Sequence, residues 1–272
     1  MPYFQTTDGT TLAYEDYGTG APLVFIAGWS LHADMWEYQL HYFVERGYRC
    51  ILLDRRGHGR SDRPSTGYDV NTRADDIAAL IEHLDLNDFA MVAHSAGGGE
   101  VVRYLSRHGQ ERVNRIALLA PAIPFMCQTE DNPFGAPRAM FEASAAQLKS
   151  ERPQWFAERA QGYFATHLRR GTSQAVIDME MRRCLSASAY ATIAVQAELF
   201  NSDHRPDVAA VTVPLLLLHG LADQSIPIDI ASRQAVKLAP HAVLKEYWDA
   251  GHGLYITHAA EVNADILEFL KS

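Results

Sequence analysis

Short apolar runs alternate with segments of helical periodicity along most of this chain. Eight runs are expected to form strands: Tyr3–Thr6, Thr11–Tyr17, Leu23–Ala27, Ile51–Leu53, Phe89–Ala93, Ile116–Ala120, Leu215–His219 and Val243–Tyr247. Alternation of this kind is typical of βαβ units, so the pattern predicts an α/β fold with a mostly parallel, eight-stranded sheet flanked by helices. The turn dipeptide Asp8-Gly9 lies between the first two runs and predicts an opening antiparallel hairpin.

Three segments between or after these runs show the spacing of amphipathic helices. Residues 71–84 place Ile77, Leu80 and Ile81 on one helical face, and residues 97–107 form the second helix. The third helix closes the chain, where apolar residues recur up to Leu270.

One long region interrupts the alternation of strands and helices. Residues 122–207 contain no convincing strand, and their helical patterns are rich in aromatic residues. Two compatible interpretations follow: an all-helical insertion with a small core of its own, and a cap whose aromatic side chains line a pocket. The predicted division is therefore a core of residues 1–121 and 208–272 with a helical cap, residues 122–207, inserted in it.

Composition and charge narrow the class of protein. The 272 residues carry a formal net charge of −9, which makes nucleic acid and anionic membranes poor partners. The first residues lack the basic start and apolar stretch of a signal peptide, and no run reaches the roughly 18 apolar residues of a membrane-spanning helix. Cys50, Cys127 and Cys184 are far apart without metal-type spacing, so we expect reduced, packed thiols in a cytoplasmic protein.

The segment Ala93–Gly99 carries a candidate nucleophile. It follows an apolar strand, precedes a helix and matches the nucleophile elbow, in which small residues flank a serine at both sides, here Ser95. Small residues are needed because strand and helix cross closely while the turn lifts the hydroxyl above the sheet edge. A glycine-rich phosphate-binding turn is the alternative, but the phosphate-loop lysine and the G-x-G-x-x-G spacing are missing.

A base and an acid follow Ser95 in the order that such hydrolases use, acid before histidine. Asp223 comes after the strand 215–219, and His252 lies between two glycines after the last strand. A serine hydroxyl must lose its proton as it attacks, so His252 would accept that proton while Asp223 fixes the imidazole. Asp249 is a rival acid, but it stands only three residues before His252.

Two backbone N–H groups are candidates for an oxyanion hole. Ala96 directly follows the nucleophile, and Trp29 lies in the loop after the strand 23–27, although Trp29 could also be a plain core aromatic. His58, His94 and His219 are interpreted as structural histidines, since none has metal-ligand spacing with a second ligand.

Several motifs together resemble one known group of proteins. They are Gly28-Trp29, Ala33–Glu37, Asp54–Ser61, Ser95–Val101, Arg205-Pro206-Asp207, His219-Gly220, Asp223-Gln224 and Gly251-His252-Gly253. With these motifs the chain resembles the cofactor-free bacterial haloperoxidase (perhydrolase) and aryl esterase group of the α/β-hydrolase fold. The resemblance implies ester hydrolysis through a Ser-Asp-His triad without metal or haem, peracid formation from carboxylic acid and hydrogen peroxide, and self-association. The segment Asp54–Ser61 is common to the fold, and we expect a turn held by ion pairs there.

The sequence departs from the usual pattern of that group near the expected pocket. Ala27 replaces a histidine, Ser30 a proline, Ala93 a glycine and Ala96 a methionine. These changes should reshape the pocket floor, and Ser30 favours ester hydrolysis over efficient perhydrolysis. The residues expected to line the pocket are Ser30, Phe125, Phe134, Trp155, Phe164 and Leu254.

The function predicted from the sequence is hydrolysis of small carboxylic esters through an acyl-enzyme, without cofactor. The same residues could instead serve perhydrolysis, or hydrolysis of a lactone, a lactam or a C–C bond. A non-enzymatic ligand receptor on this fold would not need an intact triad, so the presence of all three residues counts against that alternative. Haloalkane dehalogenases and epoxide hydrolases are excluded because they use an aspartate where this chain has Ser95.

Overall fold

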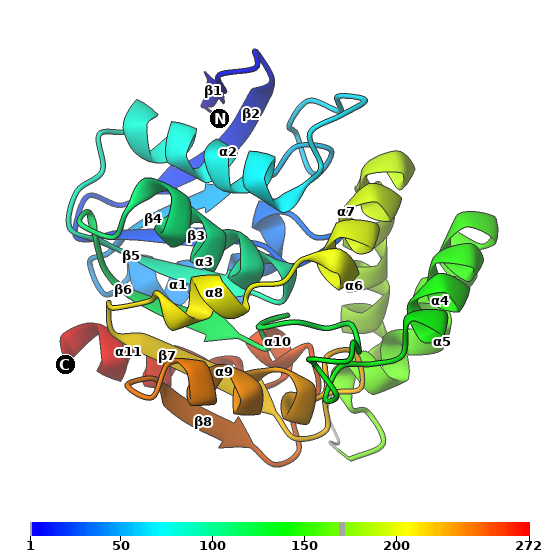
Figure 1. Cartoon of the computed structure of the whole chain (residues 1–272). Helices are drawn as coiled ribbons and strands as arrows, with labels where there is room; N and C mark the ends of the chain where they lie inside the picture. Colours follow the sequence, from blue (N-terminus) through cyan, green and yellow to red (C-terminus); the bar gives the residue numbers. More distant parts are fainter. Residues whose placement is uncertain (1, 169–171) are drawn as a thin grey trace.

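A single eight-stranded sheet organises the chain in the computed structural model, which describes residues 2–168 and 172–272 (Figure 1). The strands are β1 (Tyr3–Gln5), β2 (Thr11–Tyr17), β3 (Pro22–Ile26), β4 (Arg49–Leu53), β5 (Phe89–His94), β6 (Val113–Leu119), β7 (Leu215–Gly220) and β8 (Val243–Tyr247). Their order in the sheet is β1-β2-β4-β3-β5-β6-β7-β8. The pairs β1/β2 and β2/β4 are antiparallel, and every later pair is parallel. The predicted mostly parallel, eight-stranded sheet is confirmed.

Strand boundaries differ from the prediction where polar residues interrupt an apolar run. Strand β6 begins at Val113, three residues before the predicted start, because Asn114 and Arg115 lie within the strand. Both are partly exposed, and Asn114 donates a hydrogen bond to the backbone of Asp88. Apolar periodicity alone therefore missed the first three residues of β6.

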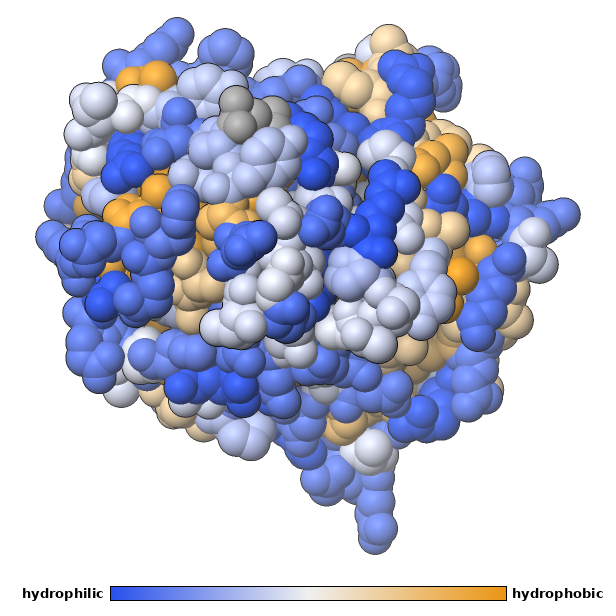
Figure 2. Space-filling view, turned by 90° about the horizontal axis from the view of Figure 1, so that it is seen from above, coloured by the Kyte–Doolittle hydropathy of each residue, from blue (hydrophilic) through white to orange (hydrophobic). Residues whose placement is uncertain are grey.

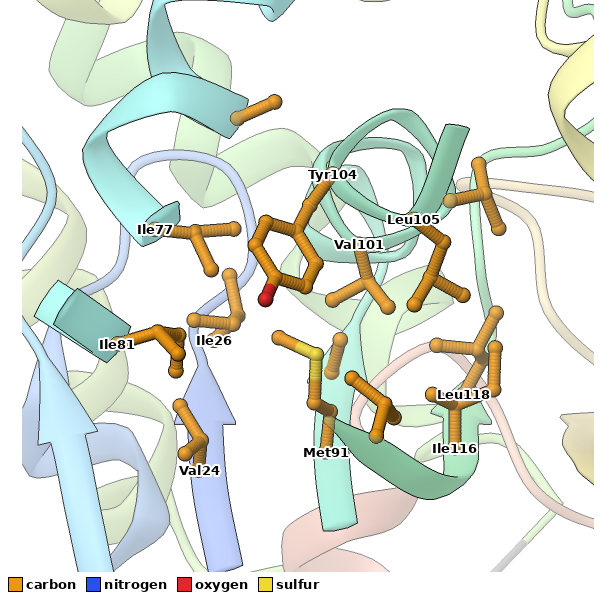
Figure 3. Close-up of a cluster of buried hydrophobic side chains, with 14 of the residues drawn as sticks. Val24, Ile26, Ile77, Ile81, Met91, Val101, Tyr104, Leu105, Ile116 and Leu118 are labelled. Carbon is orange, nitrogen blue, oxygen red and sulfur yellow. The ribbon is translucent and has the colours of Figure 1, made fainter. Parts of the chain in front are cut away.

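Helices α2 (Val70–His83), α3 (Ala96–His108), α8 (Arg205–Ala209) and α9 (Ser232–Leu238) cover one face of the sheet (Figure 1). Alternate residues of the central strands point to this face, because side chains of a strand alternate between its two sides. Figure 3 shows Ile26, Met91 and Leu118 from three strands packed against Ile77 and Tyr104 of α2 and α3. All five are buried.

Helices α1 (Glu37–Val44), α10 (Leu254–Thr257) and α11 (Ala259–Lys271) cover the opposite face. The intervening strand residues, among them Phe25, Val92 and Leu216, form a second core with Phe43 and Ile266 from these helices. The central strands are buried on both sides, which explains why they are almost continuously apolar in the sequence.

Helices α4 (Arg138–Ser150), α5 (Arg152–Phe164), α6 (Gln174–Ser186) and α7 (Ala189–Asn201) lie between β6 and β7 in the chain. We call these four helices the cap helices. They gather on the side of the molecule toward which the arrowheads of the parallel strands point (Figure 1). Phe141 of α4 stacks on Phe200 of α7 with ring centroids 3.8 Å apart. The fifth helix of the region, α8, packs instead against α3 and α9, and the division of the chain at residues 122 and 207 remains a prediction.

The face seen from above in Figure 2 is mainly hydrophilic, with its hydrophobic residues in small separate groups. Within residues 2–168 and 172–272, no helix is long and apolar enough to cross a membrane.

Candidate active site

A sharp turn between β5 and α3 holds Ser95. Its backbone has φ 52° and ψ −118°, a region that non-glycine residues seldom adopt. Neighbouring backbone stabilises this conformation, since the Ser95 N–H donates to the Leu119 carbonyl at 2.9 Å and the Ser95 carbonyl accepts from Ala122 N–H at 3.0 Å. The strained turn and its fixation are what a nucleophile elbow requires.

Close packing at this turn explains the need for small residues. A Cβ atom added to Gly97 would lie 2.7 Å from the carbonyl oxygens of both Ile26 and Ala27. No side chain fits between the start of α3 and the end of β3 at that point. Ala93, which replaces the usual glycine, is fully buried and its methyl group is accommodated.

His252 and Asp223 meet above the ends of β7 and β8. His252 Nδ1 lies 2.7 Å from Asp223 Oδ2, and both side chains are buried. The other carboxylate oxygen, Oδ1, accepts hydrogen bonds from the backbone N–H groups of Ser225 and Ile226, each at 2.8 Å. Because a carboxylate only accepts, His252 Nδ1 carries the proton and Nε2 is left as the basic nitrogen.

A second histidine supports the same carboxylate. His219 Nε2 lies 2.8 Å from the Ile226 carbonyl and 3.3 Å from Asp223 Oδ2, so this nitrogen carries the proton. Burial by itself would raise the pKa of Asp223. The attraction of His252 and the hydrogen bonds of both histidines outweigh burial and hold that pKa well below its ordinary value. Asp223 is thus a stable anion beneath the imidazole.

Ser95 and His252 line the same cavity, which has a volume of about 390 Å³. The rival acid Asp249 receives a hydrogen bond from His258 Nε2 at 2.9 Å. The structure therefore places Ser95 and His252 on the wall of one cavity, with the Asp223 carboxylate behind the imidazole of His252.

The loop after β3 carries Trp29, one of the two residues predicted for the oxyanion hole. Arg55 holds this loop by donating to the carbonyls of Gly28 at 2.6 Å and Ala27 at 2.5 Å. Glu100 fixes the guanidinium in turn, 3.1 Å from Arg55, and both side chains are buried. No acceptor for the backbone N–H of Trp29 is found among the hydrogen bonds of the described residues. Ala96 is the first residue of α3, where backbone N–H groups have no partner within the helix.

The segment 54–61 forms the predicted turn held by ion pairs. Arg60 contacts Asp54 at 2.8 Å, and the buried Arg56 reaches Asp76 of α2 at 2.6 Å. The role of Arg55 in holding the loop after β3 was not predicted, since its acceptors are carbonyl groups that sequence does not distinguish.

His94 also has a role that the sequence prediction missed. Its Nε2 lies 3.0 Å from the carbonyl oxygen of His252, so it donates to the backbone of the proposed base. The two imidazole rings lie 4.6 Å apart, and burial keeps the pKa of His94 below its ordinary value. A neutral His94 therefore anchors the loop of His252.

A buried chain of polar side chains joins the cap helices to this loop. Tyr163 of α5 packs edge-on against the His252 ring, and its hydroxyl lies 2.9 Å from that of Tyr255. The Tyr255 hydroxyl donates to Glu180 of α6, which also accepts from Arg183 at 2.9 Å. Burial raises the pKa of Glu180. In sequence, Glu180 is an ordinary helical glutamate, and only the packing of α6 places it at the cavity.

Three of the six predicted pocket residues line the cavity, namely Ser30, Trp155 and Phe164. The other three lie elsewhere, which corrects the prediction. Phe125 packs against Arg205, with the guanidinium 5.3 Å from the ring, and Phe134 is 54% exposed beside Lys237. Leu254 is fully buried in the core behind the sheet. All three side chains make their contacts outside the cavity.

Among the described residues, no group of three or more His, Cys, Asp or Glu side chains is arranged to hold a metal ion. Cys50, Cys127 and Cys184 are free and buried, as predicted for packed thiols. Burial raises the pKa of Cys184, which lines the cavity, to about 12, so its thiol stays protonated.

Comparison with known proteins identifies close relatives. Residues 21–259 match the family described as the alpha/beta hydrolase fold. The chain is 41% identical over 274 residues to a non-heme haloperoxidase of Rhodococcus erythropolis and 34% identical over 276 residues to a bifunctional esterase/perhydrolase of Acinetobacter calcoaceticus; each alignment covers 100% of both chains. An esterase structure from Exiguobacterium antarcticum has a TM-score of 0.94 at 30% identity and covers 99% of each chain.

Proposed function

The chain belongs to the α/β-hydrolase fold family, and on that premise we propose that it is a serine hydrolase of small carboxylic esters. The observation that carries the proposal is the pairing of His252 Nδ1 with Asp223 at 2.7 Å, with Nε2 left basic beside the cavity that Ser95 lines. This tautomer is the one that can accept a proton from a serine hydroxyl.

In the acylation step the Ser95 oxygen attacks the ester carbonyl while His252 Nε2 takes the hydroxyl proton. The carbonyl oxygen becomes an oxyanion that the N–H groups of Trp29 and Ala96 stabilise, each worth about 3 kcal/mol. The tetrahedral intermediate collapses, the imidazolium gives its proton to the leaving alcohol, and an acyl-enzyme remains on Ser95.

Deacylation repeats these steps with water as the nucleophile. His252 takes a proton from the water, the hydroxide oxygen bonds to the acyl carbon, and the proton returns to Ser95 as the carboxylic acid leaves. Asp223 stays ionised throughout, since its depressed pKa keeps the proton on the imidazole. The cavity, about 390 Å³ and lined mainly by aromatic and apolar side chains, suits a small acyl chain.

Perhydrolysis is the second candidate, and the names of the relatives favour it. Hydrogen peroxide would replace water and release a peracid from the same acyl-enzyme. Ser30 argues for ester hydrolysis as the main activity, because its φ of 61° is closed to the proline common in the haloperoxidases. The loop beside the cavity therefore takes a course that a proline could not follow.

The proposal is tested with nitrophenyl acetate and with Ser95→Ala. We expect the wild-type protein to release nitrophenol with a burst and a fluorophosphonate probe to label Ser95 alone. Turnover should be lost in Ser95→Ala, while its thermal unfolding stays within a few degrees of wild type. Retained turnover in that variant would refute the role of Ser95, and peracid formation faster than ester hydrolysis would favour the second candidate.

A further inference from the structure

Gln196 of α7 lines the cavity and has a side-chain amide oxygen without a hydrogen-bond partner among the described residues. The side chain is buried, with 2% exposed, and it lines the same cavity as Ser95. Such a buried acceptor is uncommon, because burial removes its hydrogen bonds to water without replacing them.

Gln196 lies one helical turn from a hydrogen bond that joins α7 to the loop after β3. Thr192 stands one helical turn before Gln196, and its carbonyl accepts a hydrogen bond from Trp29 Nε1 at 2.8 Å. Residues four apart lie on the same helix face, and long side chains point back toward the preceding turn. The Gln196 amide is therefore directed toward the part of α7 that is tied to the loop after β3.

The cavity residues around this part of α7 are mainly apolar, whereas the Gln196 amide is polar. The aromatic rings of Trp29, Phe156 and Phe200 line the same cavity, as does Leu199 of α7. Methionine or leucine would fill the position without an unpaired polar group. An uncharged acceptor here suits a neutral hydrogen-bond donor on a ligand. The carboxylates that line the cavity, Glu158 and Glu180, belong to α5 and α6 and not to α7.

We propose that Gln196 is a specificity residue that accepts a hydrogen bond from a hydroxyl or amide N–H of the substrate, away from the reacting carbonyl. The substrate class is then an ester that carries such a donor within the length of the cavity, and hydroxy esters are its simplest members. This inference rests on the proposed ester hydrolysis and adds the chemistry of the substrate to it.

The test compares nitrophenyl esters that differ in a single substituent. Butyrate and valerate esters with a hydroxyl at carbon 2 or 3, from which the hydroxyl cannot close a five- or six-membered lactone, are paired with esters carrying fluorine at the same carbon, since fluorine is similar in size and donates nothing. Hydroxyalkyl and fluoroalkyl acetates extend the same comparison to the alcohol side. The measured quantity is the ratio of kcat/KM for each hydroxyl ester to that of its fluorine partner.

For at least one position we expect the wild-type ratio to exceed about tenfold. Gln196→Met should reduce that ratio to about one. Gln154→Met is the matched control, because Gln154 lies exposed on cap helix α5 outside the cavity and the ratio should survive there. A purely structural role for Gln196 would change both esters of a pair equally and leave the ratio intact.

Two failures are distinguishable. Ratios near one at every position in the wild-type protein, or ratios that Gln196→Met leaves unchanged, would overturn the inference while ester hydrolysis stands. Absence of turnover for the whole ester set, or turnover that survives Ser95→Ala, would overturn the proposed function itself.

Discussion

Replacing Asp223 by asparagine tests the proposed mechanism at its most constrained point. The carboxylate is fully buried, with Oδ2 facing His252 Nδ1 and His219 Nε2 and with Oδ1 accepting two backbone N–H groups. Asparagine has one acceptor oxygen and one donor NH₂ group, so one of these two sides must lose its acceptor.

The structure indicates which orientation of the new amide costs less. An NH₂ group at the Oδ1 position would leave two buried backbone N–H groups unpaired, at about 1–3 kcal/mol each. An NH₂ group at the Oδ2 position leaves His219 its bond to the Ile226 carbonyl and forces only His252 to respond. His252 would then accept at Nδ1 and carry its proton on Nε2, the nitrogen that must be free to act as a base.

We therefore expect kcat of Asp223→Asn to fall about 10⁴-fold, or about 5.4 kcal/mol, which is the size of effect that a wrong imidazole tautomer can have in a Ser-His-Asp triad. The assay is nitrophenyl acetate hydrolysis, with circular dichroism to verify the fold. Asp249→Asn is the control, because Asp249 lies on the loop of His252 but binds His258 at the end of α10, and its kcat should stay within about threefold of wild type. A loss below tenfold in Asp223→Asn, or an equal loss in the control, would refute this assignment of the acid.

Three further predictions concern the acidity of Asp223 and the contacts of Arg55 and Trp29. The pKa of Asp223 is depressed in the folded protein, so its contribution to stability is fully present above the ordinary carboxyl range near pH 4 and is lost as pH falls toward the folded value. The free energy of unfolding in urea should therefore fall less between pH 7 and pH 3 in Asp223→Asn than in wild type. Arg55→Lys replaces the rigid two-armed guanidinium, which bonds both loop carbonyls, by a single ammonium group; kcat should fall about ten- to a hundredfold with a smaller change in KM, and unchanged kcat would contradict the positioning role. Trp29→Phe removes the bond to the Thr192 carbonyl and should lower the free energy of unfolding by about 1 kcal/mol in urea titrations, whereas an unaltered midpoint would show that this tether contributes nothing.

The sheet and the residues at its carboxyl edge were predictable because local sequence determines them. Buried parallel strands are apolar throughout, and the turn around Ser95 permits only small residues such as Gly97. Asp223 and His252 follow their strands directly, and carboxyl ends of parallel strands meet at one edge of a sheet. Topology thus converts sequence order into proximity.

The cavity wall could not be predicted in the same way. An aromatic residue in an amphipathic helix shows that it will be buried but not against which partner, so Phe134 was assigned to the pocket although it lies exposed beside Lys237. Glu180 and Gln196 give the opposite error, because polar residues in helices normally face water. Only the packing of the cap helices on the sheet reveals them. The cytoplasmic location and the self-association expected from the sequence remain predictions.

Two of the hydrogen bonds that hold the cap helices on the core run from Trp29 Nε1 to the Thr192 carbonyl and from Gly253 N–H to the Tyr163 carbonyl, the latter at 2.8 Å. The first bond involves the loop beside the proposed oxyanion site, and the second involves the loop that bears His252. A chimera that imports residues 138–201 from a relative would preserve the reaction only if the graft matched both attachments. Selectivity and chemistry in this enzyme can therefore be exchanged separately in sequence, but they are not independent in three dimensions.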